Sequence, residues 1–260
     1  MRKSLLDVVF MSEKRKGVFL LLQDEAKDMD FLLSSLNTTR QALLPQVKVL
    51  EEHYLVSHYK DTYELTTIGK LMTDEMVPLV GVLEVLDVDI DYWGTHDFDF
   101  IPPGLLKRIK ELEHCEIITP HLTELYSLHK TYHKDKTTEH VHSVGNIFYP
   151  DYQSRFTEMI DNKITIDYII SENLFDKIRT EDYSYFRSVI KSGYFNLCVY
   201  HQKMNFLFFT FDDYHIVINP LKNNGDIDTK YMLCSARDAL KWGKDLFDYY
   251  LRDSTQITDI

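Results

Sequence analysis

The segment from residue 27 to residue 65 constrains the fold most, because two helix patterns are followed at once by a hairpin pattern. The expected elements are helix 27–36, a break at Asn37, helix 38–52, a strand from Leu55, a polar turn over 57–62 and a returning strand over 63–65. This order is typical of winged helix-turn-helix domains, which place their second helix in the DNA major groove. The alternative is an ordinary helical pair in an all-α domain, and the hairpin argues against it.

The second predicted helix, 38–52, has two distinct faces. Its apolar residues recur at helical spacing and predict a core face made of Leu36, Leu43, Val47 and Leu50. A different face carries Thr38, Gln41, Pro45 and Lys48. Thr38 and Gln41 fit a capping box, and Pro45 should bend the helix or end its first part. Polar and basic side chains on this face and on the hairpin suit base edges and phosphates. The candidate DNA-binding residues are Thr38, Thr39, Arg40, Gln41, Lys48, His58 and Lys60.

A further helix is expected from Thr66 or Thr67 onward. Its apolar residues follow a heptad spacing over about two heptads and form a seam made of Met72, Met76, Leu79, Leu83 and Leu86. Such a seam favours a homodimer, in which two DNA-reading helices address two half-sites. The alternative is packing of the seam against the chain's own body.

The charge distribution weighs against non-specific binding of nucleic acid, because the net charge is −12. Residues 1–75 carry 10 Lys and Arg against 12 Asp and Glu, whereas residues 76–260 carry 19 against 29. The negative charge therefore lies mainly outside the predicted DNA reader, which would need a local basic patch. The candidates for this patch are Lys14, Arg15, Lys16, Arg40, Lys48 and Lys60.

The sequence gives no sign of export or of membrane insertion. The N-terminal apolar run is broken by Asp7, which argues against a signal peptide, and the longest apolar runs are far too short to span a bilayer. The three cysteines, Cys115, Cys198 and Cys234, are widely spaced and form no Cys-x-x-Cys motif. We therefore expect a cytoplasmic protein with reduced thiols.

Three regions are expected: a DNA-binding domain with its dimer helix over 1–88, an acidic linker with a short helix over 89–113, and an α/β effector-sensing domain over 114–260. The expected strands of the last region are 115–118, 141–148, 164–170, 194–200, 206–211, 215–219 and 231–234. Its expected helices are 122–133, 152–161, 172–178, 183–191 and 236–252, the last with a loose capping box of Ser235 and Asp238. The fold class is therefore mixed α+β and α/β, and the sheet could be similar to that of phospholipase D.

Aromatic side chains gather where one predicted strand of the second domain ends. In open α/β sheets, ligands bind outside the carboxyl ends of the strands. We therefore expect an effector pocket there, although core packing explains any single aromatic equally well. Its candidate residues are Phe148, Tyr149, Tyr152, Tyr168, Tyr200 and His201.

Enzymatic activity is not expected. The chain lacks a phosphate-binding glycine-rich loop, a nucleophile elbow and an H-E-x-x-H motif. His201 and Lys203 match the start of the phospholipase D signature, but Phe208 stands where that signature requires Asp. A degenerate phospholipase D-like phosphodiesterase is kept as an alternative.

A dense group of histidines offers a second alternative, a metal-sensing regulator. The group comprises His114, His121, His129, His133, His140 and His142. His129 and His133 lie one helical turn apart on a predicted helix. His140 and His142 lie on the same side of a predicted strand. Both spacings suit zinc or nickel. Exposed polar histidines are the simpler interpretation, so no metal and no other cofactor is expected.

The whole chain resembles archaeal winged-helix regulators whose second domain is named after the Fil methanogenesis regulator. The resemblance extends over nearly the full length and rests on residues 12–16, 43–48, 63–70, 92–93, 101–106, 146–150, 212–213 and 242–250. Pro45 is similar to what that family carries, whereas the Cys-x-Cys of metal-sensing ArsR relatives is missing from the second predicted helix. The resemblance implies a cytoplasmic, ArsR-like transcription regulator without enzyme activity, from a methanogen. Its partners would be an operator in double-stranded DNA and an effector that the resemblance does not identify.

Overall fold

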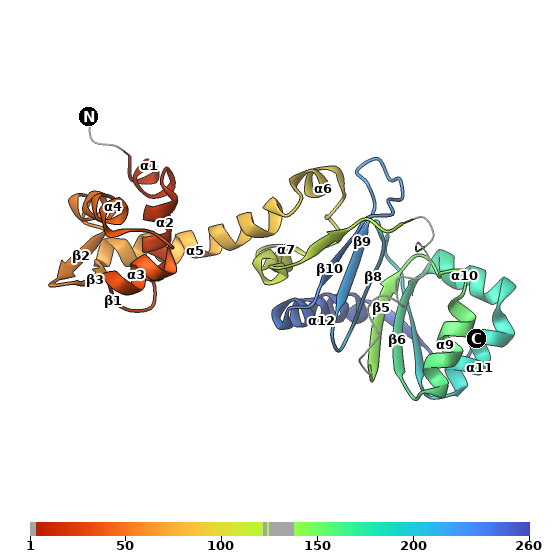
Figure 1. Cartoon of the computed structure of the whole chain (residues 1–260). Coiled ribbons are helices and arrows are strands. Elements are labelled where there is room, and N and C mark those ends of the chain that lie inside the picture. Colours follow the sequence, from red (N-terminus) through yellow and green to blue (C-terminus); the bar gives the residue numbers. More distant parts are fainter. Residues whose placement is uncertain (1–3, 122–123, 125–137) are drawn as a thin grey trace. The chain divides into compact units, whose positions relative to one another are not determined.

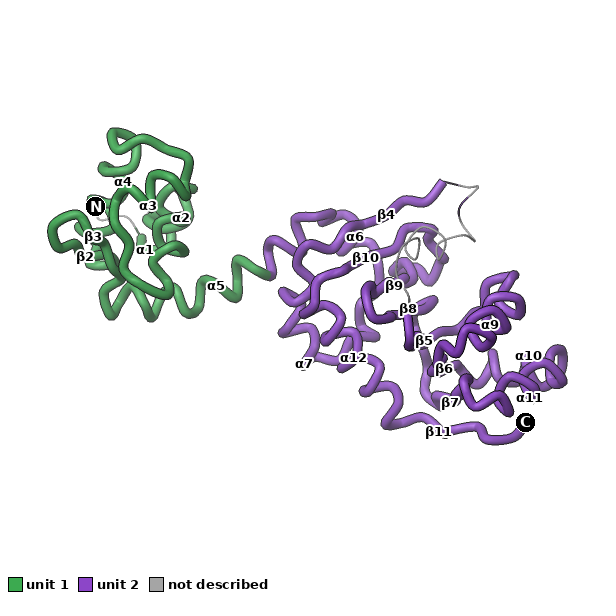
Figure 2. The backbone as a smooth tube through the Cα atoms, turned by 60° about the horizontal axis from the view of Figure 1, so that its bottom comes forward, with its two compact units in different colours: residues 1–81 green, residues 82–260 purple. Residues whose placement is uncertain are grey.

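The computed structural model describes residues 4–121, 124 and 138–260, and the chain divides into two compact units (Figure 2). The first unit comprises residues 1–81 and the second comprises residues 82–260. Among the described residues, no helix is long and apolar enough to cross a membrane.

The first unit consists of helices and a three-stranded sheet in the order β1-β3-β2 (Figure 1). Its elements are α1 (Leu5–Phe10), α2 (Glu13–Leu21), β1 (Lys27–Asp28), α3 (Met29–Ser35), α4 (Arg40–Glu52), β2 (Val56–Tyr59), β3 (Thr62–Leu65) and the start of α5 (Thr67–Asp87). The expected order of two helices followed by a hairpin is present. Helices α3 and α4 are joined by a short turn, and β2 and β3 form the hairpin.

Two local details of the first unit differ from the sequence-based prediction. Lys27 and Asp28 do not begin a helix, because they pair with Tyr63 and Thr62 of the hairpin as strand β1. Asp28 instead caps α3, where its carboxylate accepts the Phe31 N–H at 2.8 Å. The hairpin turn is also tighter than expected, because β2 runs to Tyr59 and β3 begins at Thr62, which leaves only Lys60 and Asp61 in the turn. Lys60 occupies the left-handed region at φ 55°.

The core of the first unit forms where the helical periodicity predicts it. Leu43, Val47 and Leu50 of α4 are completely buried, and Leu36 packs against them from the turn before α4. They share this core with Met76 from α5. The buried face of α4 therefore leaves its opposite side available to solvent.

The second unit is built around an eight-stranded mixed sheet in the order β11-β7-β6-β5-β8-β9-β10-β4. Its strands are β4 (Glu116–Ile118), β5 (His140–Gly145), β6 (Thr165–Ser171), β7 (Phe195–Tyr200), β8 (Phe206–Asp212), β9 (Ile216–Pro220), β10 (Tyr231–Cys234) and β11 (Ser254–Ile257). Strands β5, β6 and β7 are parallel and the remaining pairs are antiparallel. The mixed α and β architecture confirms the expected fold class.

Helices cover both faces of this sheet (Figure 1). One face carries the crossover helices α9 (Tyr152–Asp161), α10 (Glu172–Glu181) and α11 (Tyr183–Lys191), and the other carries α12 (Arg237–Arg252). Side chains of β6 alternate between the two layers, because Tyr168 joins the core under α9 while Ile169 joins the core under α12. A sheet covered on both faces explains why its strands are nearly continuous apolar runs.

The segment expected as an acidic linker, residues 89–113, is instead part of the second unit's core. It forms α6 (Ile90–Thr95), α7 (Pro103–Leu106) and the 3-10 helix η1 (Ile109–Leu112). Its carboxylates point outward or cap helices, whereas Tyr92 and Leu112 between them are buried. The alternation of acidic and apolar residues marks amphipathic helices here, and the solvated linker was a wrong prediction.

Three further features of the second unit were not expected. Strand β11 adds an edge to the sheet by pairing with β7. Cys115, just before β4, and Cys234 of the neighbouring strand β10 form a disulfide with Cα atoms 4.3 Å apart, so two of the cysteines expected as free thiols are paired. Helix α12 begins after Ala236 without a side-chain cap, so the predicted capping box of Ser235 and Asp238 is wrong.

The predicted helix 122–133 lies outside the described residues, except for Glu124.

Candidate nucleic-acid face and effector pocket

The side of α4 opposite its core carries most of the predicted DNA-binding residues. Gln41, Pro45 and Lys48 are exposed, as are Thr39 and Arg40 at the helix start. These residues come from one helix whose other side is anchored in the core, so their relative positions are fixed by α4 itself. The arrangement presents amides, hydroxyls and cations together, which are the groups that contact base edges and phosphates.

The start of α4 differs from the predicted capping box. Thr39, not Thr38, is the N-cap residue, and its side chain makes no capping hydrogen bond. Thr38 is half-buried and closes the preceding helix, because its N–H donates to Leu33 O at 3.1 Å. A capping box cannot form when the expected cap residue belongs to the end of the previous helix.

Pro45 lies inside α4 without ending it, because the helix runs on to Glu52. Proline cannot donate the backbone hydrogen bond that Gln41 O would otherwise accept. Both residues lie on the exposed side of α4.

Two of the candidate cationic side chains are held by carboxylates. Arg40 Nη2 lies 2.5 Å from Asp61 Oδ1 in the hairpin turn, and His58 Nδ1 pairs with Glu51. Lys60 lies over the ring of Tyr59 at the end of the hairpin, with 5.4 Å between the ammonium and the ring centroid. Arginine and histidine at this surface would therefore have to exchange a carboxylate for a phosphate on binding DNA.

Arg15 is not part of a basic patch, although the sequence made it a candidate. Its side chain is buried and donates to Gln46 Oε1 at 2.8 Å and to Val8 O. It therefore links α1, α2 and α4, and the patch loses one of its six candidates.

The predicted dimer seam on α5 is only partly correct. Met76 is buried in the core of the first unit and Met72 packs against that core, so neither is available to a partner. Leu79 and Leu83 are exposed, as are Leu71 and Ile68, about two and three turns before Leu79. The exposed apolar face of α5 therefore keeps Leu79 and Leu83 of the predicted seam and adds Ile68 and Leu71, in place of Met72 and Met76.

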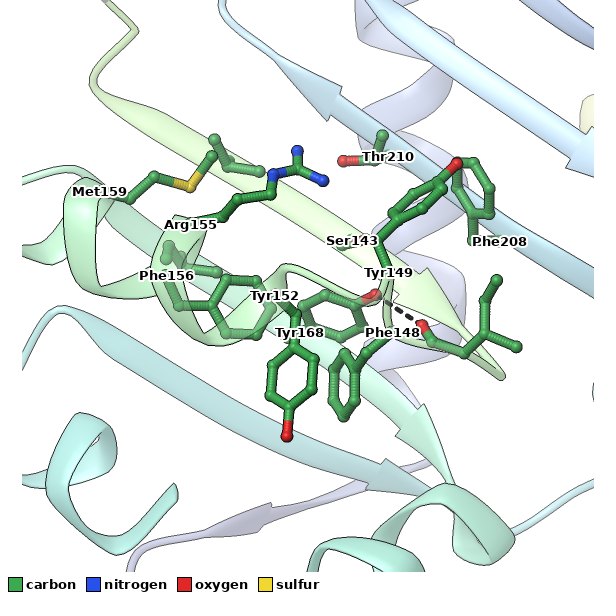
Figure 3. A pocket seen from close by; sticks show the side chains of 13 residues that line it. Ser143, Phe148, Tyr149, Tyr152, Arg155, Phe156, Met159, Tyr168, Phe208 and Thr210 are labelled. Carbon is green, nitrogen blue, oxygen red and sulfur yellow. Dashed lines mark hydrogen bonds between the residues drawn. The ribbon is translucent and has the colours of Figure 1, made fainter. Parts of the chain in front are cut away.

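A cavity of about 80 Å³ lies between α9 and the sheet of the second unit (Figure 3). Four of the six residues predicted for an effector pocket line it together: Phe148, Tyr149, Tyr152 and Tyr168. The first three follow the carboxyl end of β5, which is where the topology of parallel strands led us to expect them. The rings of Phe148 and Tyr152 stack with centroids 4.8 Å apart and form an aromatic wall.

Tyr200 and His201 lie outside this cavity. Tyr168 shares one side of the sheet with Leu197 and Val199, whereas Tyr200 is one residue out of phase and packs on Tyr250 under α12. The alternation of a strand therefore sends Tyr200 to the opposite face. Its successor, His201, is exposed at the end of β7.

Arg155 is the pocket residue that the sequence analysis missed. It lines the cavity from α9, and Figure 3 shows its guanidinium reaching toward Thr210 of β8. Burial lowers the pKa of Arg155, and the charge of Asp151 offsets only part of that effect. The signal was present in the sequence, because Arg155 interrupts the apolar face of Tyr152, Phe156 and Met159 on one helix.

The alternative of a phosphodiesterase gains no support from the surroundings of His201. Its Nδ1 lies 2.6 Å from Glu172 Oε1 and its Nε2 lies 2.9 Å from Thr255 Oγ1, so both ring nitrogens are engaged. Phe208, at the position where the signature needs Asp, is buried inside β8. A nucleophilic histidine needs one nitrogen directed at the substrate, so one of these contacts would have to break first.

The metal alternative rests on histidines that the structure places only in part. His140 and His142 share one side of β5, as predicted, with ring centroids 6.4 Å apart. His142 Nδ1 lies 3.1 Å from Asp167 Oδ2. His129 and His133 lie outside the described residues. Among the residues that are described, no three His, Cys, Asp or Glu side chains gather to hold a metal ion.

Two solved structures are similar in outline. TrmBL2, described as an archaeal chromatin protein with a novel mode of DNA binding, aligns over 97% of both chains with a TM-score of 0.44 and 11% identity. The phosphatidylserine synthase of Haemophilus influenzae aligns over 46% of this chain and 34% of its own, with a TM-score of 0.36 and 12% identity. Both scores are low, so the family assignment depends on sequence matches.

The sequence matches extend over both units. The methanogenesis regulatory protein FilR1 of Methanothrix harundinacea (strain 6Ac) is 23% identical over 256 residues, which are 95% of this chain. This chain spans 57% of the length of that relative. The family model for the N-terminal domain of methanogenesis regulatory protein FilR1 matches residues 3–84, and the model for its middle domain matches residues 125–253. The chain therefore belongs to the FilR1 family of methanogenesis regulatory proteins.

Proposed function

We propose that the chain is a sequence-specific DNA-binding transcription regulator acting in the cytoplasm. The observation that carries this proposal is the exposed face of α4 beside the β2–β3 hairpin, in a chain whose family is described as regulatory. Residues 1–88 would read DNA, and the α/β unit would sense an effector. Regulation without catalysis also agrees with the engaged nitrogens of His201.

The DNA-binding residues in this proposal are Thr38, Thr39, Arg40, Gln41, Lys48, His58 and Lys60. Gln41 and Lys48 occupy the centre of the exposed α4 face and are assigned the largest share of recognition. The glutamine amide suits a base edge, and the lysine ammonium suits phosphate. Arg40 and His58 would join them after giving up Asp61 and Glu51.

We propose further that two copies associate through the exposed apolar face of α5. Leu71 is 68% exposed and Leu79 is 48% exposed on this helix. Apolar side chains at helical spacing gain free energy when a second helix covers them. Two paired copies would present two α4 helices, as half-sites in DNA require.

The cavity beside Phe148, Tyr149, Tyr152 and Tyr168 is proposed as the effector site. An effector alters DNA binding only if it binds two conformational states with different affinity. Helix α5 is the element that continues from the first unit into the second, so we expect the change to act on α5.

The proposal is tested by measuring binding of the full chain to its own upstream DNA and to a scrambled fragment of the same length. Salt titration separates the two contributions, because phosphate contacts weaken steeply with salt whereas sequence preference persists. A specificity ratio above roughly 10³ near physiological salt would support a sequence-specific regulator. Equal, weak and salt-sensitive binding to both fragments, with and without a cell extract as effector source, would overturn it.

A further inference from the structure

Arg155 is the charged side chain among aromatic, aliphatic and hydroxyl side chains that line this cavity. Its Nε atom is buried and finds no hydrogen-bond acceptor among the described residues. A buried N–H without an acceptor loses hydration without compensation, so a fold retains one at a cost in stability. This cost is common at sites that bind an anion, because the ligand supplies the missing acceptor.

The neighbours of Arg155 do not supply that acceptor. The Tyr149 ring contacts the guanidinium as a cation–π partner, with 5.6 Å between its centroid and the guanidinium carbon. Two nearby hydroxyls donate to backbone carbonyls, and neither accepts from Arg155 Nε. Tyr168 Oη donates to Ile147 O at 3.3 Å (Figure 3), and Thr210 Oγ1 donates to His142 O at 3.0 Å. Arg155 Nε–H is therefore a charged donor that this cavity can present to a ligand.

We propose that the cavity binds a small organic oxyanion, with its charged end on Arg155 and its apolar end against Phe148 and Tyr152. Guanidinium groups bind carboxylates and phosphates through two parallel hydrogen bonds, which gives both strength and orientation. The cavity volume of about 80 Å³ is smaller than the roughly 150 Å³ that accommodates benzene. The buried part of the ligand is therefore a branched or linear group of a few carbon atoms.

A single negative charge fits this site better than two. Asp151 acts electrostatically on Arg155, and its own Oδ1 is buried without a hydrogen-bond partner among the described residues. A dianion would be attracted by one guanidinium and repelled by this carboxylate. The inference rests on the proposed effector function and adds the chemical class of the effector.

The test measures direct binding of three small probes to the full chain without DNA. Isobutyrate carries the charge, isobutyramide has the same shape without it, and isopropylphosphonate carries a phosphate-like head group. Dissociation constants are obtained by saturation-transfer NMR titration. We expect isobutyrate to bind at least tenfold more tightly than isobutyramide, because a charge-assisted pair is lost in the amide. The comparison of isobutyrate with isopropylphosphonate identifies the preferred head group.

Two variants that lose the same charge distinguish a contact inside the pocket from a general effect of the protein's net charge on anion binding. Arg155→Met should remove the preference for the acid, whereas Arg179→Met, on the exposed side of α10, should keep it. The inference would be overturned by equal binding of acid and amide, by a preference that survives Arg155→Met, or by failure of both anions to bind at tens of millimolar.

Thermal unfolding of the same variants without ligand gives an independent test. Because Arg155 Nε lacks a hydrogen-bond acceptor, Arg155→Met should leave the unfolding midpoint unchanged or raise it. A drop of several degrees relative to Arg179→Met would assign Arg155 a structural role and overturn the inference. None of these measurements involves DNA. If the probes bind as expected but the chain shows no preference for its own upstream DNA, the proposed regulatory function is refuted and the ligand class is kept. If the chain prefers that DNA but the probes do not bind as expected, only the proposed ligand class is refuted.

Discussion

Arg40 Nη2 lies 2.5 Å from Asp61 Oδ1, so an ion pair joins the first turn of α4 to the turn of the β2–β3 hairpin. Both side chains are about half-exposed, and exposed pairs of this kind contribute only about 0–1 kcal/mol to stability. The pair is therefore easily exchanged, and its principal effect is to occupy an arginine at the surface proposed to meet DNA.

Replacing Asp61 by Ala should strengthen DNA binding. The change releases Arg40 for phosphate or guanine and removes a negative charge from the surface, so the affinity for DNA should rise several-fold. The slope of the logarithm of the binding constant against the logarithm of the salt concentration should become steeper by about one. Fluorescence anisotropy over a range of salt concentrations measures both. Asp74→Ala, an exposed carboxylate of α5, is the control for charge alone. Equal gains in the two variants would contradict a specific role for the Arg40–Asp61 pair.

Gln41→Ala and Lys48→Ala should weaken DNA binding in different ways. Loss of the Gln41 amide should reduce the preference for operator over scrambled DNA by about 1–3 kcal/mol, because a base contact is lost. Loss of the Lys48 charge should weaken both complexes alike and reduce the salt slope by about one. Both residues are exposed, so circular dichroism should show unchanged folding. Unaltered binding by both variants would rule out this face of α4.

Leu71→Lys combined with Leu79→Lys should produce a monomer. Both leucines are exposed, so the charges are tolerated in a single chain but not beneath a second apolar helix. Sedimentation equilibrium reports the mass directly. Ile227→Lys, an equally drastic change at a residue 65% exposed in the second unit, should leave the assembly unchanged. A double variant with the same mass as the parent would exclude α5 as the dimer contact.

Tyr250→Phe should lower the free energy of unfolding of the second unit by about 1–2 kcal/mol. The Tyr250 hydroxyl is buried and donates to Phe100 O at 2.7 Å, so its removal leaves a buried carbonyl unsatisfied. Chemical denaturation followed by fluorescence gives the difference. Tyr249→Phe, a half-buried neighbour on the same helix, should change stability by less than about 0.5 kcal/mol. Similar losses in the two variants would argue against the buried hydrogen bond.

Gly69→Ala should destabilise the first unit by about 1–3 kcal/mol through overpacking. A Cβ on Gly69 would overlap the carbonyl oxygen of Leu55, which is backbone and cannot swing aside. Amide hydrogen exchange in the first unit reports the loss. In α6, a Cβ on Gly94 meets nothing within 4 Å, so Gly94→Ala should be neutral or slightly stabilising. A tolerated Gly69→Ala would mean that α5 can move away from Leu55.

Local periodicity was sufficient for much of the fold. Helices α9 and α11 have the bounds that their apolar spacing predicts. The strands that were predicted for the second unit lie within a residue or two of their predicted positions, except at the carboxyl end of β5. The buried face of α4 was equally predictable, since Leu43, Val47 and Leu50 recur on one side of any helix. Each of these properties depends on residues within a few positions of each other.

The candidate pocket was predictable only in its aromatic part. Phe148, Tyr149 and Tyr152 follow one strand, so topology alone places them at its carboxyl end. Tyr200 lies on the far face because strand alternation depends on the exact register of β7 against β6. Arg155 enters the cavity because of the side on which α9 packs, and a helix pattern does not specify that partner.

The sequence by itself determined the family, the order of helices and strands and the buried face of α4, because these follow from local spacing and from motifs. Tertiary structure alone decided the pairing of β11 with β7, the Cys115–Cys234 disulfide and the rotation of α5 that buries Met76 while exposing Leu79. These outcomes join residues far apart in the chain or choose between two sides of one helix. Their free energies depend on which surfaces meet when the whole chain packs, so no local pattern encodes them.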